Sequence, residues 1–394
     1  MRTKHAAHSL PAFPVYSSAF LSQNELVLGG GGGQSKTGIK NKLRLYRIED
    51  GRAIVLLDEL ELDKGEDAPM SMAAHPQEKV LACGVNSSEE HLQRGKNQNC
   101  RVFAIKDDKL SLSSSASTLT PNDVEDDFQK ITTFSPSGDL LAVGGTRDLS
   151  ILSYPSLSPF VSALHIDKGE LYDATFSSTT LVVATTVNLL VYTLPTSTGG
   201  SNENASGKGK EPSTELDLVR MVERPVFPGK DAGSSFRAAR FHPNSEKILY
   251  TVSNTVPPRT RTKSSPRKAF VCKWNTDTWE VSRVRKVGDK GLTCFDVSPN
   301  GKFLAFGSSD YTVGILDSQT LAPLLTILKA HDFPPTTLRF NTTSTLLISG
   351  SADNTVRVVT VPESLGVTSW SSWIVIIVIT LLVLLLAYLA QRMT

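Results

Sequence analysis

Hydrophobic and polar positions along the chain recur as one repeated phrase. A short apolar segment is followed by a turn with Pro, Gly, Asn or Ser, and then by a second apolar segment that ends in small residues. Each phrase predicts a β-hairpin, and repetition at this scale is typical of propellers and other repeat folds. Seven copies occur, at residues 18–29, 72–84, 133–144, 174–184, 239–250, 295–307 and 338–350.

The last two copies continue alike. Residues 309–315 are echoed at 352–358, about 43 residues later, and this is the blade spacing of WD repeats. The chain before residue 361 therefore resembles the WD-repeat family, with the Trp-Asp pair that ends such repeats degraded to Leu316-Asp317 or Lys273-Trp274. Seven copies predict an all-β fold, a seven-bladed propeller over residues 1–360.

A different pattern follows the propeller. Residues 370–390 carry no charge, and residues 374–387 are apolar except for Thr380. About 20 such residues can cross the hydrocarbon core of a bilayer as a helix. We therefore expect a linker at 361–369, a single C-terminal transmembrane helix at 370–390 and a short lumenal tail at 391–394. Residues 1–9 contain no apolar core of a signal peptide, so we expect the propeller to face the cytosol.

Composition narrows the function classes only slightly. The 394 residues are 40% hydrophobic and 20% charged with a net charge of +2, which argues against a disordered chain and against nucleic-acid binding through overall charge. The four cysteines form no CxxC pair, which fits a reducing compartment. We expect a flexible insertion at 197–214 and a basic loop at 259–268, which is a solvated loop or, less favoured, a contact for anionic lipid or an acidic partner.

The most unusual segment is the run of five glycines at 29–33. Gly30, Lys36 and Thr37 fall at the spacing of a phosphate-binding P-loop, but Ser35 replaces the second required glycine. A P-loop must also open a helix, whereas residues 43–48 read as a strand. A phosphate site is therefore rejected. A plain glycine run is often a flexible loop, so the residues that follow it decide the interpretation.

Gly38-Ile39-Lys40-Asn41-Lys42-Leu43 after this glycine run, in the first blade of a membrane-anchored propeller, resembles the potassium-binding loop of one family. Its members are the exchange factors that activate the Sar-type small GTPase for COPII coat assembly. The resemblance implies that Gly38, Ile39, Lys40 and Asn41 contact the GTPase. It also implies that a potassium ion is bound by loop carbonyl groups and the Asn41 side chain, with ligands at Gly30, Gly31, Gly32, Gly33 and Asn41.

Other chemistry-bearing residues fit structural roles. The histidines show no metal-ligand spacing, and Asp148, Asp310 and Asp353 lie at turns where an aspartate bonds backbone amides. No nucleophile elbow or paired carboxylates occur, so we expect no enzyme of covalent chemistry and disfavour a membrane-attached hydrolase.

The resemblance implies a guanine-nucleotide exchange factor at the endoplasmic reticulum membrane. It would promote GDP release from a Sar-type GTPase and so start COPII vesicle formation and transport to the Golgi. The alternative is a membrane-anchored scaffold or cargo adaptor without exchange activity, because fold does not fix function.

Overall fold

The computed structural model describes residues 4–34, 37–119, 127–195, 215–229, 231, 233–257, 266–363, 365 and 370–393. The chain forms two compact units, Met1–Val361 and Pro362–Thr394. The predicted insertion at 197–214 lies outside the described residues, and so do 259–265 of the predicted basic loop.

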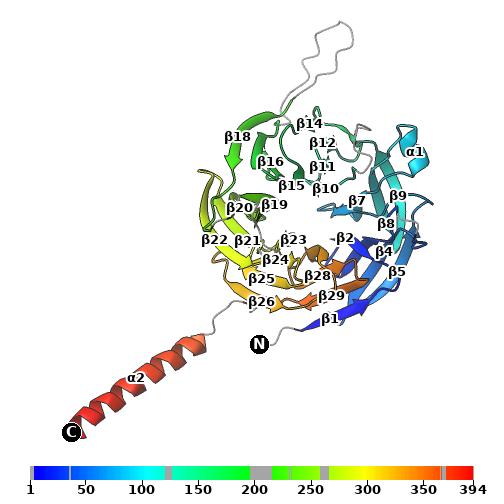
Figure 1. Ribbon diagram of the computed structural model, residues 1–394. Helices are drawn as coiled ribbons and strands as arrows, with labels where there is room; N and C mark the ends of the chain where they lie inside the picture. The colour runs from blue at the N-terminus through cyan, green and yellow to red at the C-terminus, as the bar shows by residue number, and fades with distance from the viewer. Residues whose placement is uncertain are drawn as a thin grey trace. The chain divides into compact units, whose positions relative to one another are not determined.

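The first unit is a propeller of seven antiparallel sheets set around a central axis (Figure 1). The described strands of blade 1 are β2 (Val15–Phe20), β3 (Glu25–Gly30), β4 (Lys42–Glu49) and β5 (Ala53–Glu61). Those of blade 2 are β6 (Ser71–Ala74), β7 (Val80–Gly84), β8 (Cys100–Lys106) and β9 (Lys109–Ala116). Those of blade 3 are β10 (Ile131–Phe134), β11 (Leu140–Gly144), β12 (Asp148–Ser153), β13 (Ser158–Pro159) and β14 (Leu164–His165). A short helix, α1 (Glu89–Gln93), lies between β7 and β8.

The described strands of blade 4 are β15 (Leu171–Phe176), β16 (Thr180–Thr185), β17 (Asn188–Thr193) and β18 (Asp217–Glu223). Those of blade 5 are β19 (Ser234–His242), β20 (Ser245–Thr255), β21 (Ala269–Asn275) and β22 (Glu280–Gly288). Those of blade 6 are β23 (Leu292–Val297), β24 (Phe303–Ser308), β25 (Val313–Asp317) and β26 (Pro323–Ile327). Each predicted apolar phrase is the hairpin of the first and second strands of a blade, and the predicted seven-bladed propeller is confirmed.

Blade 7 closes the ring with strands from both ends of the unit. It consists of β27 (Pro335–Phe340), β28 (Leu346–Ser351), β29 (Thr355–Thr360) and, as its outermost strand, β1 (His5–Ser9). The register of β1 against β29 runs from His5 opposite Val359 to Ser9 opposite Thr355. Pairing the N-terminal strand with the last blade joins the first and last repeats, so the propeller cannot open without breaking this ladder.

The small residues that end the second strands have a packing reason. A Cβ atom on Gly307 would lie 2.9 Å from the Pro335 side chain, and one on Gly350 would lie 2.7 Å from the Val15 side chain. In both cases the close neighbour belongs to the first strand of the next blade. The glycines therefore allow adjacent blades to pack at the channel side of the sheet.

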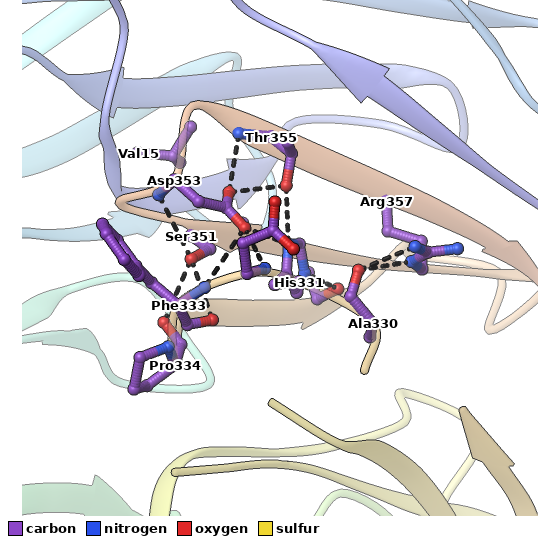
Figure 2. A network of polar contacts seen from close by, with 12 residues as sticks. Val15, Ala330, His331, Phe333, Pro334, Ser351, Asp353, Thr355 and Arg357 are labelled. Atoms are coloured by element: carbon purple, nitrogen blue, oxygen red, sulfur yellow. Dashed lines mark hydrogen bonds and ion pairs between the residues drawn. The ribbon is translucent and has the colours of Figure 1, made fainter. Parts of the chain in front are cut away.

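A buried polar network stabilises blade 7 (Figure 2). Nδ1 of His331 lies 2.7 Å from the Thr355 hydroxyl, and Nε2 lies 2.8 Å from the Ser349 hydroxyl. Asp353 accepts hydrogen bonds from the backbone amide and the hydroxyl of Thr355, the structural role predicted for it. Burial lowers the pKa of His331 to about 4, so the ring is neutral near pH 7.

The second unit contains the helix α2 (Trp370–Met393). Its described apolar side chains are exposed: Ile376, Ile377, Val378, Ile379, Leu381, Leu382, Val383, Leu384 and Tyr388. Judged on the residues that the structure describes, the protein has no helix long and apolar enough to cross a membrane. The transmembrane helix expected at 370–390 is therefore not confirmed.

Candidate functional site

The glycine loop, residues 31–41, connects the second and third strands of blade 1. β3 ends at Gly30 and β4 begins at Lys42, and none of the described residues between them forms the helix that a P-loop requires. In antiparallel blades, loops between second and third strands and loops between successive blades emerge on one side of the propeller. We call this side the glycine-loop face. Ser35 and Lys36 lie outside the described residues.

Asn41 fastens the loop across its base. Its Oδ1 accepts a hydrogen bond from the Gly33 amide at 2.9 Å, while its Nδ2 donates to the Gly33 carbonyl at 3.0 Å. Nδ2 also donates to the Glu66 carbonyl at 2.7 Å. Asn41 is buried, with 8% of its surface exposed, so these bonds are shielded from water. The side chain therefore fixes where the glycines lie relative to β4 and to the segment that leads into blade 2.

A buried ion pair supports Glu66 from the second blade. The Arg101 guanidinium on β8 donates to both carboxylate oxygens of Glu66, with one N–O distance of 2.8 Å. The Glu66 carboxylate also accepts a hydrogen bond from the Asp63 amide at 3.0 Å. This bidentate pair fixes the position of residue 66, whose carbonyl holds Asn41. The glycine loop of blade 1 is thus positioned by blade 2.

The glycines make approaches that a side chain would prevent. A Cβ atom on Gly31, whose φ is +142°, would lie 2.2 Å from Oδ1 of Asn41 and 2.7 Å from the Lys40 carbonyl oxygen. One on Gly32 would lie 2.4 Å from the Thr37 hydroxyl and 2.8 Å from the Ile39 carbonyl oxygen. Only glycine fits either position.

Four neutral oxygens lie close to these two glycines: the Lys40 carbonyl and Oδ1 of Asn41 beside Gly31, and the Ile39 carbonyl and the Thr37 hydroxyl beside Gly32. This donor set suits a hard monovalent cation such as potassium. Among the predicted potassium ligands, Gly31, Gly32, Gly33 and Asn41 lie together. Gly30 instead lies in β3, paired with Val15 and Lys42.

Of the residues predicted to contact the GTPase, Gly38, Ile39 and Lys40 lie at the outer part of the loop, whereas Asn41 is buried at its base. Gly38 and Lys40 are exposed, and Ile39 is half-buried. The Lys40 ammonium forms an exposed ion pair with Glu61 at 2.6 Å, and such a pair adds little to stability. Ile39 therefore offers an apolar side chain on a loop whose base is fixed by buried hydrogen bonds.

A carboxylate lies beside the loop. Asp67 accepts a hydrogen bond from the Ala68 amide at 2.7 Å. Burial raises its pKa above the usual aspartate range, against the opposing effect of backbone hydrogen bonds from Ala68 and Gln34. Burial, followed by the charge of Asp67, also raises the pKa of Tyr16. The base of the loop is therefore a low-dielectric environment.

Among the described residues, the side chains around the central channel form no reactive set. The lining of its cavity of about 160 Å³ includes charged residues, among them Arg240 and Asp173, which form an ion pair. Burial raises the pKa of the Cys294 thiol to about 12, which leaves it protonated. The described residues contain no group of three or more His, Cys, Asp or Glu side chains that could hold a metal. The hydrolase alternative gains no support.

Two comparisons with known proteins concern the fold of the chain. The WD domain, G-beta repeat model matches residues 282–317 and 322–359, in blades 5 to 7. A crystal structure of Raptor from Chaetomium thermophilum superposes with a TM-score of 0.62 at 12% identity, over 92% of this chain and 29% of Raptor. At that identity the likeness shows the propeller fold alone.

Three curated relatives match most of the chain. The guanine nucleotide-exchange factor SEC12 of Candida glabrata is 22% identical, over 89% of this chain and 71% of the relative. The mouse SEC12 is 24% identical, over 83% of this chain and 81% of the relative. The SEC12-like protein 2 of Arabidopsis thaliana is 25% identical, over 84% of this chain and 74% of the relative. The chain is related to the SEC12 exchange factors. The family resemblance predicted from the glycine loop is thereby confirmed.

Sequence reasoning missed the support of the glycine loop. Glu66 and Arg101 are 35 positions apart, on a connecting segment and on the third strand of blade 2, and no motif links them. Thr37, whose hydroxyl lies against Gly32, was considered only as part of a P-loop. Charged residues in otherwise apolar repeat positions, such as Arg101 within β8, are the one signal that could have indicated a buried pair.

Proposed function

We propose that this protein is a guanine-nucleotide exchange factor for a Sar-type small GTPase. The observation that carries the proposal is the glycine loop, fixed at its base by Asn41 and carrying the half-buried Ile39, in a chain similar to SEC12 exchange factors. A loop held in this way can insert into a partner without paying the full entropic cost of ordering on binding.

The mechanism needs no covalent step. A factor that binds the nucleotide-free GTPase more tightly than the GDP-bound form lowers the affinity for GDP by the same factor, because linkage is reciprocal. GDP then leaves and abundant GTP enters. In this mechanism Ile39 with its neighbours Gly38 and Lys40 contacts the GTPase switch region, while Asn41 keeps the loop in the competent conformation.

The proposed potassium ion would bind at the glycines. Gly31, Gly32, Gly33 and Asn41 would hold it, joined by the neutral oxygens of Thr37, Ile39 and Lys40 that gather there. The ion would supply a positive charge that orients several carbonyl groups inward. A binding site present only in the folded protein raises thermal stability, so melting in potassium chloride and in sodium chloride measures the proposed selectivity. Equal melting temperatures in the two salts would contradict a potassium-selective site.

We further propose that residues 370–390 anchor the propeller to the endoplasmic reticulum membrane, with the propeller in the cytosol. The support is the uncharged sequence of 370–390 and the exposed apolar side chains on α2. Activation beside a bilayer would place the GTPase where a COPII coat grows and would start transport to the Golgi. Resistance of the full chain to alkaline carbonate extraction from membranes is the expected result, and release into the supernatant would remove the anchor from this proposal.

The test of the exchange function is the rate of GDP release from a purified Sar-type GTPase, with the full chain in detergent micelles. We expect acceleration by at least tenfold, on the order of the coupling seen between linked sites. The scaffold alternative predicts binding without any preference for the nucleotide-free GTPase and no acceleration. That result would replace the proposed function by the alternative.

A further inference from the structure

Exposed apolar side chains are unevenly distributed between the two faces of the propeller. Among the described residues of the first unit, every exposed large apolar side chain that lies in a loop is on the glycine-loop face. These residues are Val226, Val256, Tyr311, Leu328 and Phe333. The other exposed ones lie on the outermost strands β5, β9, β18 and β22. Clustering on one face marks an interaction surface more strongly than scattered exposure does.

Direct contacts connect the glycine loop with blade 7. The Gly31 amide donates to the Pro14 carbonyl at 3.0 Å. The adjacent Phe13 amide donates to Oδ1 of Asn354 at 2.9 Å, in the loop between β28 and β29. The segment that enters blade 1 therefore links the glycine loop to the neighbouring loop of blade 7.

The same series of hydrogen bonds reaches the segment that carries the exposed apolar side chains of Leu328 and Phe333. Oδ2 of Asp353, the residue before Asn354, accepts a hydrogen bond from the Phe333 amide at 3.4 Å. Phe333 is 56% exposed and Leu328 is 75% exposed, and both lie on the segment between β26 and β27. Hydrogen bonds thus connect Gly31 with this segment through Phe13 and Asn354.

The segment that carries Phe333 has a fixed base. His331 is buried between the hydroxyls of Thr355 and Ser349, and the Arg357 guanidinium donates two hydrogen bonds to the Ala330 carbonyl, at 2.9 and 2.7 Å. Figure 2 shows this network, with the Phe333 ring outside it. An exposed aromatic ring on a rigid support loses little entropy when a partner covers it, and this favours a binding anchor.

We propose that the GTPase engaged by the glycine loop also docks on Leu328 and Phe333, so that one partner covers the face from blade 1 to blade 7. The inference rests on the proposed exchange function, because its partner is the GTPase named there. Ile39 then acts on the nucleotide site, while Leu328 and Phe333 supply affinity that is equal for all nucleotide states. Affinity of this uniform kind lowers KM without changing kcat.

The experiment measures GDP release against the concentration of the full chain in detergent micelles, for wild type, Leu328→Ser, Phe333→Ser and the double variant. Val284→Ser is the matched control, because Val284 is 49% exposed on the outer strand β22, away from this face. We expect each single variant to raise KM by about tenfold with little change in kcat, as for loss of an anchor residue. The control should keep the wild-type KM, and all variants should keep the wild-type melting temperature.

The experiment distinguishes failure of the docking surface from failure of the exchange function. Acceleration by wild type and double variant with equal KM would overturn this docking surface and leave the exchange function standing. No acceleration by wild type would overturn the proposed function, and the partner named here with it.

Discussion

The side chain of Asn41 forms a two-bond ring with the backbone of Gly33, accepting from its amide at 2.9 Å and donating to its carbonyl at 3.0 Å. This pairing resembles the one between neighbouring strands and closes the loop at its base. Asn41→Asp keeps the acceptor but turns a carboxylate oxygen toward the carbonyls of Gly33 and Glu66. We expect a loss of about 2 kcal/mol of stability, as for a buried partner left unsatisfied.

Urea unfolding of the full chain in detergent micelles measures that loss. Asn244→Asp serves as the control, because Asn244 is exposed and its Nδ2 donates to the Asn300 carbonyl at 3.3 Å. The control should lose less than about 1 kcal/mol, the value of one exposed hydrogen bond. Equal losses for the two variants would show that Asn41 does not fasten the loop.

Gly31→Ala should disrupt the loop, whereas Gly95→Ala should only strain the backbone. Both glycines have positive φ, +142° and +69°, but a Cβ on Gly31 meets Asn41 at 2.2 Å and one on Gly95 meets nothing within 4 Å. We expect Gly95→Ala to cost about 1 kcal/mol from strain alone. Gly31→Ala should cost more and also lower the exchange rate. A wild-type exchange rate in Gly31→Ala would mean that the close approach is dispensable.

Arg101→Met leaves the Glu66 carboxylate buried without its partner. Both residues are less than 10% exposed, and breaking such a pair costs about 3–5 kcal/mol. Arg94→Met is the control, because Arg94 pairs with Glu90 on the surface of α1, and such pairs contribute about 0.3–0.5 kcal/mol. Chemical unfolding of the two variants checks the difference. Similar midpoints for both would contradict a structural role for the Arg101–Glu66 pair.

Stability should fall as pH is lowered from about 6.5 to about 4, partly because of His331. Burial lowers its pKa in the folded state to about 4, while an unfolded histidine titrates near 6.5. In this window the unfolded state binds a proton that the folded state excludes. The stability from the neutral ring is therefore present above pH 6.5 and lost on acidification, by at most about 3 kcal/mol.

His331→Gln isolates this contribution. Burial also lowers the pKa of His242, which adds to the loss of stability on acidification. Burial raises the pKa of Asp296, which opposes that loss. Subtracting the pH profile of the variant from that of wild type removes both. We expect the difference to shrink between pH 6.5 and 4, since only wild type loses the neutral ring. A difference that does not vary with pH would assign the acid sensitivity elsewhere.

The repeat pattern was sufficient to predict the propeller, because every blade needs an apolar hairpin with small residues beside the next blade. Gly307 and Gly350 show that requirement directly. The N-terminal strand in blade 7 could not be predicted, since β1 is short, largely exposed and carries no apolar alternation. Its position depends on β29, more than 340 residues away.

The candidate site was predictable in its location but not in its geometry. Five successive glycines indicate close backbone approach, and Asn41 follows them at a distance that a loop can close. The partners of Asn41 depend on tertiary structure, because the carbonyl of Glu66 is placed by Arg101 in another blade. Pairings of this kind leave no local pattern in a single sequence.

The most direct test of the exchange mechanism is GDP release from a Sar-type GTPase in potassium buffer, catalysed by the full chain in detergent micelles as wild type, Ile39→Ala and Asn41→Ala. We predict strong acceleration by wild type and a loss of at least about tenfold in kcat for both variants, with folded propellers confirmed by circular dichroism. Ile39→Ala should lose the contact and keep the loop, whereas Asn41→Ala should release the loop. Wild-type kcat in both variants would contradict the assignment of exchange to the glycine loop.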